Sequence, residues 1–338
     1  MTDFDWPLAI MLAIATTAVV ALAMPPLIGW LRRRAVWDRP NARSSHSEPT
    51  PRGGGIAVCG GILLSALIWL GFHPDPLHAI MLGGMTALAV VSWLDDRHGG
   101  LPAGLRLAMH GFAIGAVIAI LPADLRIAPD WIPLWLERLI CFFAWLWFTN
   151  LFNFMDGING ITGGEMAAIG AGLLLMQVFG AGLGSTAALG AIMAAAAAGF
   201  LPWNWNRAKV FLGDVGSVPL GYLIGWLLLD AALHGQWAAA LILPMYYWVD
   251  ATVTLLRRLW RREKIWQAHR SHFYQQGARR LGSHVAVTTR LLMLNLFLAG
   301  MAVASLQSGM MALAATGLAA AAAAGLCRHF AMPANPVE

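Results

Sequence analysis

The sequence predicts an all-α integral membrane protein that crosses the bilayer about eleven times. Of its 338 residues, 59% are hydrophobic and only 12% are charged, whereas a soluble domain carries about 25% charged residues. The mean hydropathy is +0.64. Because a helix needs about 20 apolar residues to span a bilayer, the chain has room for roughly ten spans and short loops. This composition excludes an ordinary soluble globular protein.

Eleven apolar segments are expected to be helices, because a backbone inside lipid must satisfy its own hydrogen bonds. They cover residues 7–31, 53–72, 77–94, 104–121, 134–153, 161–179, 184–201, 213–230, 237–256, 289–306 and 310–327. The first segment is too long for the core of a signal peptide and has no basic segment before it, so we expect it to be retained. We interpret residues 1–338 as a single transmembrane domain.

The lysine and arginine residues predict the orientation. If the N-terminus lies outside, the inner loops are about 32–52, 95–103, 154–160, 202–212 and 257–288. With their flanking span ends and the C-terminal tail, these loops hold 20 of the 22 basic residues, all except Arg126 and Arg138. This asymmetry follows the positive-inside rule, and contacts with anionic lipid head groups account for the net charge of +5. Without an exposed basic module, we expect no nucleic-acid partner.

The first two inner loops place charged residues at the membrane boundary. Arg52 precedes three glycines, residues 53–55, and the guanidinium with the backbone N–H groups could hold an anion. For this loop alone, a turn before a span is the simpler interpretation. Asp95 and Asp96 begin the second loop, where adjacent carboxylates repel one another and lose hydration. We favour a functional role there over an acidic helix end that faces water.

Polar residues recur every three positions before and within the third inner loop, at Asn150, Asn153, Asp156 and Asn159. On a helix, this spacing places neighbouring members on one face. Gly157 then opens the backbone. Hydrogen bonding between helices is the alternative explanation, and we favour a binding site.

A single acid, Asp214, lies between two glycines at the start of the eighth span. An aspartate there is also an ordinary helix cap, but a cap does not require the flanking glycines, which suit close approach of a ligand or metal. Asp250 lies in the ninth span, about two turns from the next basic residues. It is a candidate functional acid, or a structural ion-pair partner of Arg257 or Arg258.

The long basic loop contains two histidines, His269 and His272, whose spacing would place them on one face of a helix. Zinc would need further ligands, and no cysteine is near. A role facing a phosphate is therefore the functional interpretation. The alternative is an amphipathic helix at the membrane interface.

Five polar motifs thus share one face of the membrane, and their carboxylates are hard oxygen ligands. That chemistry suits Mg²⁺, which takes one or two carboxylates together with waters and substrate phosphates. The residues predict a membrane enzyme that transfers a phosphorylated group from a soluble donor to an acceptor in the bilayer. A secondary transporter is the alternative from another class, but it would place its polar residues near the bilayer midplane, often with inverted repeats.

The motifs also resemble the polyprenyl-phosphate N-acetylhexosamine-1-phosphate transferases, of the glycosyltransferase family 4 type. The most specific pieces are Asp95-Asp96, the run 150–160 and the segment 211–214, in this order along nearly the whole chain. Members transfer a sugar-1-phosphate from a UDP-sugar to undecaprenyl phosphate, release UMP and require magnesium. The resemblance implies an active site on the cytoplasmic face of the bacterial inner membrane. We prefer direct attack by the lipid phosphate over a covalent aspartyl intermediate.

The resemblance also implies roles for particular residues. Asp214 and Asp156 would bind Mg²⁺, with Mn²⁺ as an alternative ion. The predicted catalytic residues are Asp95, Asp96, Asp156, His269 and His272. The predicted substrate-binding residues are Arg52, Asn150, Asn153, Gly157, Asn159, Phe211 and Arg270. Among these, Asn153 and Asp156 would line the nucleotide diphosphate site, and Phe211, Gly157 and Asn159 would lie near the uracil.

Two segments, 40–46 and 268–274, are similar to the O-antigen initiating transferases of Gram-negative bacteria. Peptidoglycan enzymes of this family have consecutive histidines where this chain reads His-Arg-Ser-His, and Pro-Thr-Met-Gly-Gly where it reads Pro-Thr-Pro-Arg-Gly-Gly-Gly. We therefore predict a UDP-linked N-acetylated amino sugar as donor for O-antigen or another surface polysaccharide. Phospho-N-acetylmuramoyl-pentapeptide transfer is the alternative. The expected partners are undecaprenyl phosphate, the UDP-sugar and membrane lipids, and a homodimer is one assembly to consider.

Overall fold

The computed structural model describes residues 4–40, 48–129, 131–264 and 269–332. The described chain is almost entirely helical, which confirms the all-α prediction. Its helices are α1 (Trp6–Arg33), α2 (Gly55–Phe72), α3 (Pro76–His98), α4 (Ala103–Ile120), α5 (Leu134–Phe154), α6 (Ile161–Val178), α7 (Ser185–Asn204), α8 (Asp214–Leu233), α9 (Trp237–Ile242), α10 (Met245–Trp260), α11 (Phe273–Leu281), α12 (His284–Ala304) and α13 (Gly309–Ala331). Two short strands, β1 (Trp37–Asp38) and β2 (Thr50–Pro51), pair antiparallel.

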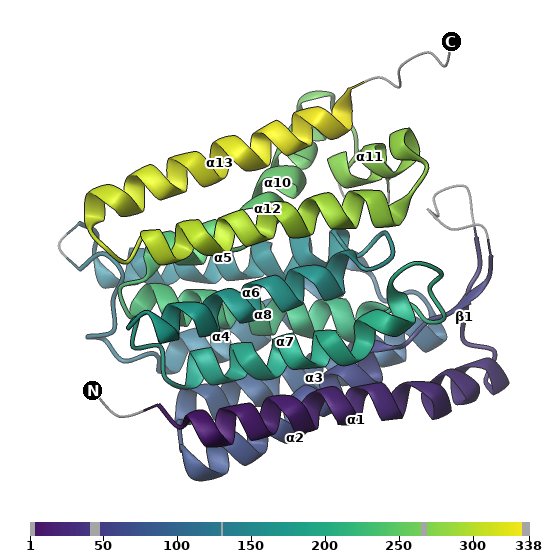
Figure 1. The fold of residues 1–338 in the computed structure, drawn as a ribbon, viewed down its shortest axis with the longest axis horizontal. Coiled ribbons are helices and arrows are strands. Elements are labelled where there is room, and N and C mark those ends of the chain that lie inside the picture. The colour runs from purple at the N-terminus through teal and green to yellow at the C-terminus, as the bar shows by residue number, and fades with distance from the viewer. Residues whose placement is uncertain (1–3, 41–47, 130, 265–268, 333–338) are drawn as a thin grey trace.

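The long helices lie side by side in one bundle, with the N- and C-termini at opposite ends (Figure 1). Among the described residues, nine helices are long and apolar enough to cross a membrane. Helix α5 has 21 residues but is outside that set, because Glu137, Arg138 and three tryptophans make it less apolar. Large apolar side chains such as Leu22, Phe112 and Leu296 are 76–81% exposed, as expected for a surface that faces lipid. The chain is a multi-pass membrane protein.

The ninth predicted span is not one continuous helix. In place of an unbroken segment 237–256, the chain forms α9 and α10, which are separated at Leu243 and Pro244. Proline has no N–H to donate and its ring clashes with the preceding turn, so Pro244 favours a break in the helix at this position. The other ten predicted segments each match one long helix. The count of about eleven therefore holds only if α9 and α10 together make one passage.

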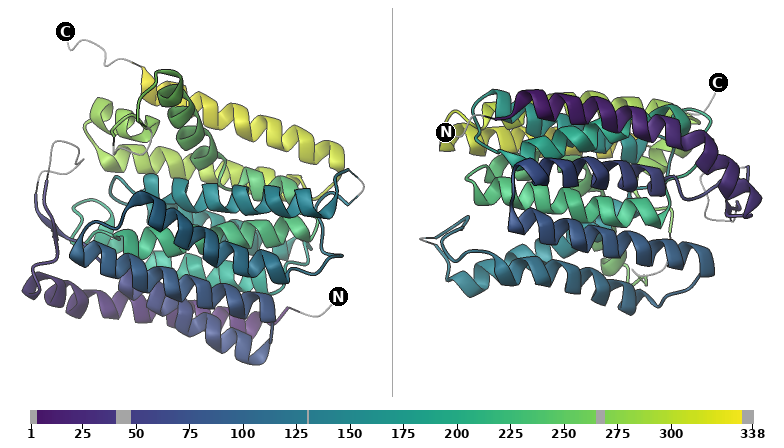
Figure 2. Two further views of the ribbon diagram at one scale, coloured as in Figure 1. Left: turned by 180° about the vertical axis from the view of Figure 1, so that it is seen from behind. Right: turned by 90° about the horizontal axis from the view of Figure 1, so that it is seen from below.

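Helix α8 is the centre of the bundle. Every residue from Val215 to Leu233 is buried, because the helix is apolar on all sides and is surrounded by other helices. Small residues let its neighbours approach closely. A Cβ atom at Gly221 would lie 2.9 Å from the Thr149 carbonyl oxygen of α5, and one at Gly225 would lie 2.4 Å from the Trp145 side chain. The two further views in Figure 2 show the helices packed around this centre.

The start of α8 also contacts the start of α2. A Cβ atom at Gly55 would lie only 2.3 Å from the Cα atom of Gly216. This contact fixes where Asp214, the first residue of α8, lies relative to Arg52, which directly precedes the glycines that lead into α2.

We expect Gly55→Ala to destabilise the protein by about 1–3 kcal/mol, because the added methyl group overpacks a contact between two backbones. The measurement is the thermal unfolding midpoint in detergent. Gly60→Ala on the same helix is the matched control, since its Cβ atom would meet nothing within 4 Å. An equal midpoint for the two variants would contradict the close contact of α2 and α8.

Candidate active site

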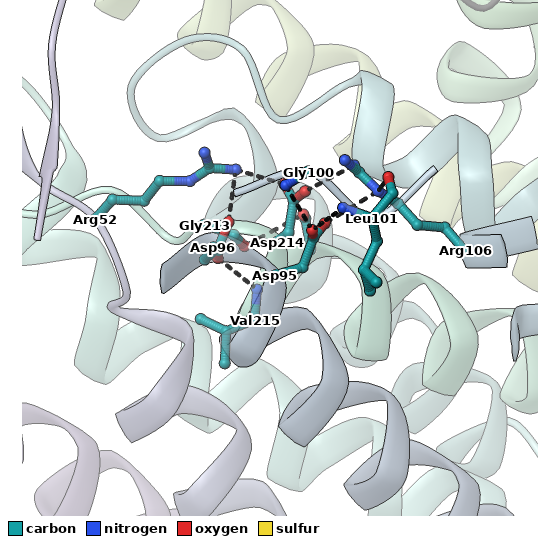
Figure 3. A network of polar contacts seen from close by, with 10 residues as sticks. Arg52, Asp95, Asp96, Gly100, Leu101, Arg106, Gly213, Asp214 and Val215 are labelled. Carbon is teal, nitrogen blue, oxygen red and sulfur yellow. Dashed lines mark hydrogen bonds and ion pairs between the residues drawn. The ribbon is translucent and has the colours of Figure 1, made fainter. Parts of the chain in front are cut away.

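Three carboxylates from two helices meet at one end of the bundle (Figure 3). Asp95 and Asp96 lie near the C-terminal end of α3, which continues to His98, and Asp214 is the first residue of α8. The prediction that Asp95 and Asp96 begin a loop was therefore wrong. The Asp95 and Asp96 side chains are only 8% and 3% exposed. Carboxylates this buried must be paired or hydrogen-bonded, because charge is costly to remove from water.

Arg52 joins two of these carboxylates. Its Nη2 atom lies 2.6 Å from Asp214 Oδ1 and 3.0 Å from Asp96 Oδ1. The arginine is held in place by its neighbours in the chain: the Phe211 N–H donates to the Pro51 carbonyl oxygen at 2.8 Å, and Arg52 and Phe211 form a parallel bridge. Arg52, which the sequence predicted to bind the substrate, therefore lies beside two of the predicted acids.

A second arginine, Arg106 of α4, was not among the predicted site residues. Its Nε atom lies 3.0 Å from Asp95 Oδ2, and its Nη1 atom lies 3.6 Å from Asp214 Oδ2. Asp214 is therefore shared by both guanidinium groups. The available signal in the sequence was an arginine one turn inside an apolar span, where a charge is costly unless it has a partner.

Backbone N–H groups complete the partners of the acids. Asp95 Oδ1 accepts from the Leu101 N–H at 2.8 Å and the Gly100 N–H at 3.2 Å. Asp96 Oδ2 accepts from the Val215 N–H at 3.1 Å. A Cβ atom at Gly213, where φ is +78°, would lie 3.0 Å from the same Asp96 oxygen. Gly213 therefore allows Asp96 to approach the start of α8.

The N–H groups of the three glycines after Arg52 do not form an anion site. This corrects the interpretation that these N–H groups and the Arg52 guanidinium together hold an anion. The N–H groups of Gly53 and Gly54 donate to the Phe211 carbonyl oxygen at 3.1 and 2.9 Å, and that of Gly55 donates to the Leu212 carbonyl oxygen at 2.9 Å. Because these donors are used inside the protein, the glycines serve the packing of α2 against the 211–214 segment.

Asp156 lies in the loop between α5 and α6, beside this cluster. Its Oδ1 atom accepts a hydrogen bond from the Thr162 hydroxyl at 2.6 Å. Burial raises the pKa of Asp156 to about 6, and the hydrogen bond from Thr162 and the charge of Arg52 partly oppose that rise. The charge of Asp214 also acts on Asp156 and raises its pKa. Asp156 is therefore an electrostatic neighbour of the Arg52–Asp214 pair.

The three predicted asparagines do not form one row. Asn150 donates from Nδ2 to the Leu146 carbonyl oxygen at 2.7 Å, within its own helix. Asn153 is half-buried on the last turn of α5. Asn159 donates from Nδ2 to the Asn206 carbonyl oxygen at 2.9 Å. The helix ends at Phe154, so its periodicity does not extend to Asn159.

The histidines form a second polar cluster. His272 is buried, and its Nδ1 atom lies 3.0 Å from Asp250 Oδ1. The rings of His269 and His272 stack with centroids 4.9 Å apart. The expected helix through both residues is wrong, because α11 begins only at Phe273. Burial, with the charges of His272 and Arg258, lowers the pKa of His269 to about 4, so this ring is neutral at physiological pH.

Asp250 does not pair with the arginines proposed from sequence. Arg258 Nε lies 2.8 Å from Glu263 Oε2, and the Arg257 guanidinium lies over the Phe273 ring at 4.9 Å. Asp250 instead contacts His272. Arg270, the remaining predicted residue of this loop, is partly buried. Of the segments 40–46 and 268–274, residues 41–46 and 268 lie outside the described part of the chain.

One contact joins the two clusters. The Tyr274 hydroxyl donates to the Phe154 carbonyl oxygen at 3.0 Å. A Cβ atom at Gly157 would lie 2.1 Å from the same hydroxyl oxygen. The start of α11 therefore packs directly on the loop that carries Asp156, and Gly157 is required by this packing.

A pocket opens at the carboxylate cluster. Its polar lining is Ser92, Asp95, Arg106, His110 and Asp214, and its apolar lining includes Leu88, Val91 and Met109. The same three apolar residues also line a groove between α3 and α4, together with Ala87, Ala108, Phe112 and Ala113. The polar pocket and the apolar groove therefore lie next to each other.

The donor set fits a magnesium ion in its chemistry. In the described part of the chain, no group of three or more His, Cys, Asp or Glu side chains is arranged to hold a metal by itself. Magnesium needs only one or two carboxylates when substrate phosphates supply further oxygens. Asp214 is 20% exposed at its side chain and is therefore more open to such a ternary site than Asp95 or Asp96.

Comparisons with known proteins show the family to which the chain belongs. Residues 78–232 match the model of glycosyl transferase family 4. A phospho-N-acetylmuramoyl-pentapeptide-transferase of Synechococcus sp. is 31% identical over 250 residues, which cover 68% of this chain and 69% of that protein. The chain belongs to glycosyl transferase family 4. It is therefore an enzyme, and the transporter alternative is excluded.

Other relatives in the family carry different names. A probable undecaprenyl-phosphate N-acetylglucosaminyl 1-phosphate transferase of Bacillus subtilis is 25% identical over 280 residues, covering 79% of this chain and 76% of the relative. A decaprenyl-phosphate N-acetylglucosaminephosphotransferase of Mycolicibacterium smegmatis is 30% identical over 229 residues, covering 58% and 54%. The family match 78–232 contains Arg106 and all the acids of the first cluster, but neither Arg52 nor the histidines.

We expect Arg106→Gln to lower kcat/KM of the transferase about 10²-fold, because Asp95 and Asp214 then lose a shared cation at the reaction site. Steady-state kinetics in detergent is the measurement. Arg97→Gln is the control, since Arg97 is exposed beside Asp96 at the end of α3, and should retain activity within about twofold. Equal activity of both variants would remove Arg106 from the site.

Proposed function

We propose that the protein transfers an N-acetylated amino-sugar-1-phosphate from a UDP-sugar to undecaprenyl phosphate, in the bacterial inner membrane. The products are UMP and a lipid-linked diphosphate sugar, which begins the synthesis of O-antigen or another surface polysaccharide. Membership of the family and the names of the relatives support a polyprenyl phosphate acceptor. The sugar and the pathway rest on the sequence resemblance alone.

The observation that carries the proposal is that the polar pocket and the apolar groove lie next to each other and share three lining residues. An isoprenoid phosphate has an anionic head and a long apolar chain, so it needs both surfaces next to each other. Asp95, Arg106 and Asp214 line the pocket, and residues of α3 and α4 line the groove. We assign the acceptor phosphate to the pocket and the first isoprene units to the groove.

The reaction needs charge stabilisation more than a strong base. An oxygen of the acceptor phosphate attacks the phosphorus that carries the sugar, and the bond from that phosphorus to the bridging oxygen breaks, so that UMP leaves with the electron pair. The guanidinium groups would stabilise charge on the transferring phosphoryl group. The ion pairs use one nitrogen of Arg52 and two of Arg106, whereas each guanidinium has three that carry hydrogen.

Magnesium, held by Asp214 and Asp156, would supply Lewis-acid stabilisation of the phosphate oxygens; Mn²⁺ is an alternative ion. Asp95 and Asp96 would orient Arg106 and Arg52 and position the acceptor. A phosphate monoester is already largely ionised near neutral pH, because its second pKa is about 6. Direct attack in one step therefore needs no covalent aspartyl intermediate.

Phospho-N-acetylmuramoyl-pentapeptide transfer is the second candidate. It is favoured by the relative with 31% identity, which bears that name. The two candidates differ only in the donor, so a single assay with different UDP-sugars separates them.

We expect the purified protein to release UMP when it is given undecaprenyl phosphate, Mg²⁺ and one N-acetylated UDP-sugar. Each donor is tested alone, including UDP-N-acetylglucosamine, its 6-deoxy relatives and the muramoyl-pentapeptide donor. Chelation with EDTA and Asp214→Ala should each abolish release, and excess Mg²⁺ should restore only the chelated wild type. Turnover by Asp214→Ala at the wild-type rate would overturn the metal assignment. Release with the muramoyl-pentapeptide donor alone would select the second candidate.

We expect Ala108→Trp to raise the KM for undecaprenyl phosphate about tenfold or more, because the indole fills the exposed groove and removes apolar contact area. The KM for the UDP-sugar should not change. Ala119→Trp is the matched control, as an exposed alanine on the same helix outside the groove. An unchanged lipid KM in Ala108→Trp would move the isoprenoid chain to another surface.

A further inference from the structure

A completely buried carboxylate in α10, Asp250, accepts hydrogen bonds from two segments, its own helix and residues 272–274 at the start of α11. Its exposed fraction is 0%. Oδ1 accepts from His272 Nδ1 and the Phe273 N–H, both at 3.0 Å, and from the Thr254 hydroxyl at 3.3 Å. Oδ2 accepts from the Tyr246 hydroxyl and the Tyr274 N–H, both at 2.9 Å. Both oxygens therefore have several partners, as a buried charge requires.

Two of these contacts cap α11 from outside. Phe273 and Tyr274 are the first two residues of that helix, and their N–H groups have no partner within the helix itself. His272, at the cap position, makes no side-chain hydrogen bond to the helix. The carboxylate of Asp250, which belongs to α10, caps α11 in place of the His272 side chain. The start of α11 and the His272 ring are therefore held by the same carboxylate.

The contact to His272 also decides which ring nitrogen carries hydrogen. An ionised carboxylate can only accept, so Nδ1 must be the donor. The hydrogen bond fixes both the tautomer and the orientation of the ring and leaves Nε2 as the nitrogen for other chemistry. We propose that Asp250 is a positioning residue that acts through His272, by holding its imidazole as the Nδ1–H tautomer at the start of α11.

The contacts of Asp250 are also linked to the first cluster. Tyr274, whose N–H is bound by Asp250, donates from its hydroxyl to the Phe154 carbonyl oxygen and packs on Gly157. Asp156 lies between those two residues in the chain and directly precedes Gly157. Asp250 thus holds His272 in a fixed place relative to the loop of Asp156. This inference rests on the proposed function only where activity is the readout.

The first test is the tautomer of the wild-type protein, read from ¹⁵N chemical shifts of labelled histidine in nanodiscs. The chain has ten histidines, and His272→Ala assigns the signal. Hydrogen on Nδ1 of His272 is expected. Hydrogen on Nε2 with Nδ1 bare would overturn the proposal, whether or not the protein releases UMP. This test needs no variant at Asp250 to fold.

The second test is a double-mutant cycle on UMP release. Asp250→Asn should lower kcat about 10²-fold, with the KM of both substrates changed less than about threefold. In the His272→Ala background, Asp250→Asn should lower kcat by less than about twofold. The two effects are not additive when Asp250 acts through His272. Equal losses in both backgrounds would show a separate structural role and overturn the proposal.

Asp230→Asn is the matched control for this cycle. Asp230 is a buried aspartate of α8 that accepts from the Thr186 hydroxyl. Thr186 lies in the first turn of α7, at the end of the bundle opposite the site. Its substitution should have the same proportional effect on kcat with and without His272. No UMP release by the wild type under any condition would contradict the proposed function, while the tautomer measurement would still decide the role of Asp250.

Discussion

Three carboxylates share a membrane boundary in this protein, and they can do so because two guanidinium groups lie between them. Asp95, Asp96 and Asp214 would repel one another in a medium of low dielectric constant. Arg52 and Arg106 join them into one network. Since these residues come from α3, α4, α8 and the segment between β2 and α2, the network fixes four parts of the bundle relative to one another. A substrate diphosphate would enter a site whose positive charges are already in place.

The precision of this site comes from helices rather than from loops. Helix α8 is buried along its whole length, and glycines bring α2 and α5 against its backbone. Asp214 therefore begins a helix that has little freedom to move. In contrast, the side of α3 and α4 that lines the groove faces lipid and is lined mainly by small and flexible side chains. A rigid polar pocket beside an adaptable apolar surface suits an acceptor with a defined head and a long chain.

The histidine cluster depends on a different anchor. Asp250 accepts hydrogen bonds from the first two N–H groups of α11. The Tyr274 hydroxyl then donates to the loop that carries Asp156. The interruption between α9 and α10 separates α10, which holds this anchor, from the short helix α9 before it. The two polar clusters thus meet where the Tyr274 side chain contacts the backbone of one short loop.

The sequence by itself determined the class of fold, the places of the helices and the identity of most acids in the site. Apolar length is a local property, and the cost of an unpaired charge in a membrane marks Asp95, Asp96 and Asp214 wherever the helices pack. Only the tertiary structure decided the partners. Arg106, the Asp250–His272 contact and the internal use of the glycine N–H groups all depend on which helices are neighbours. Helix packing sets these neighbours through side-chain shape summed over the whole bundle, and no short stretch of sequence contains that information.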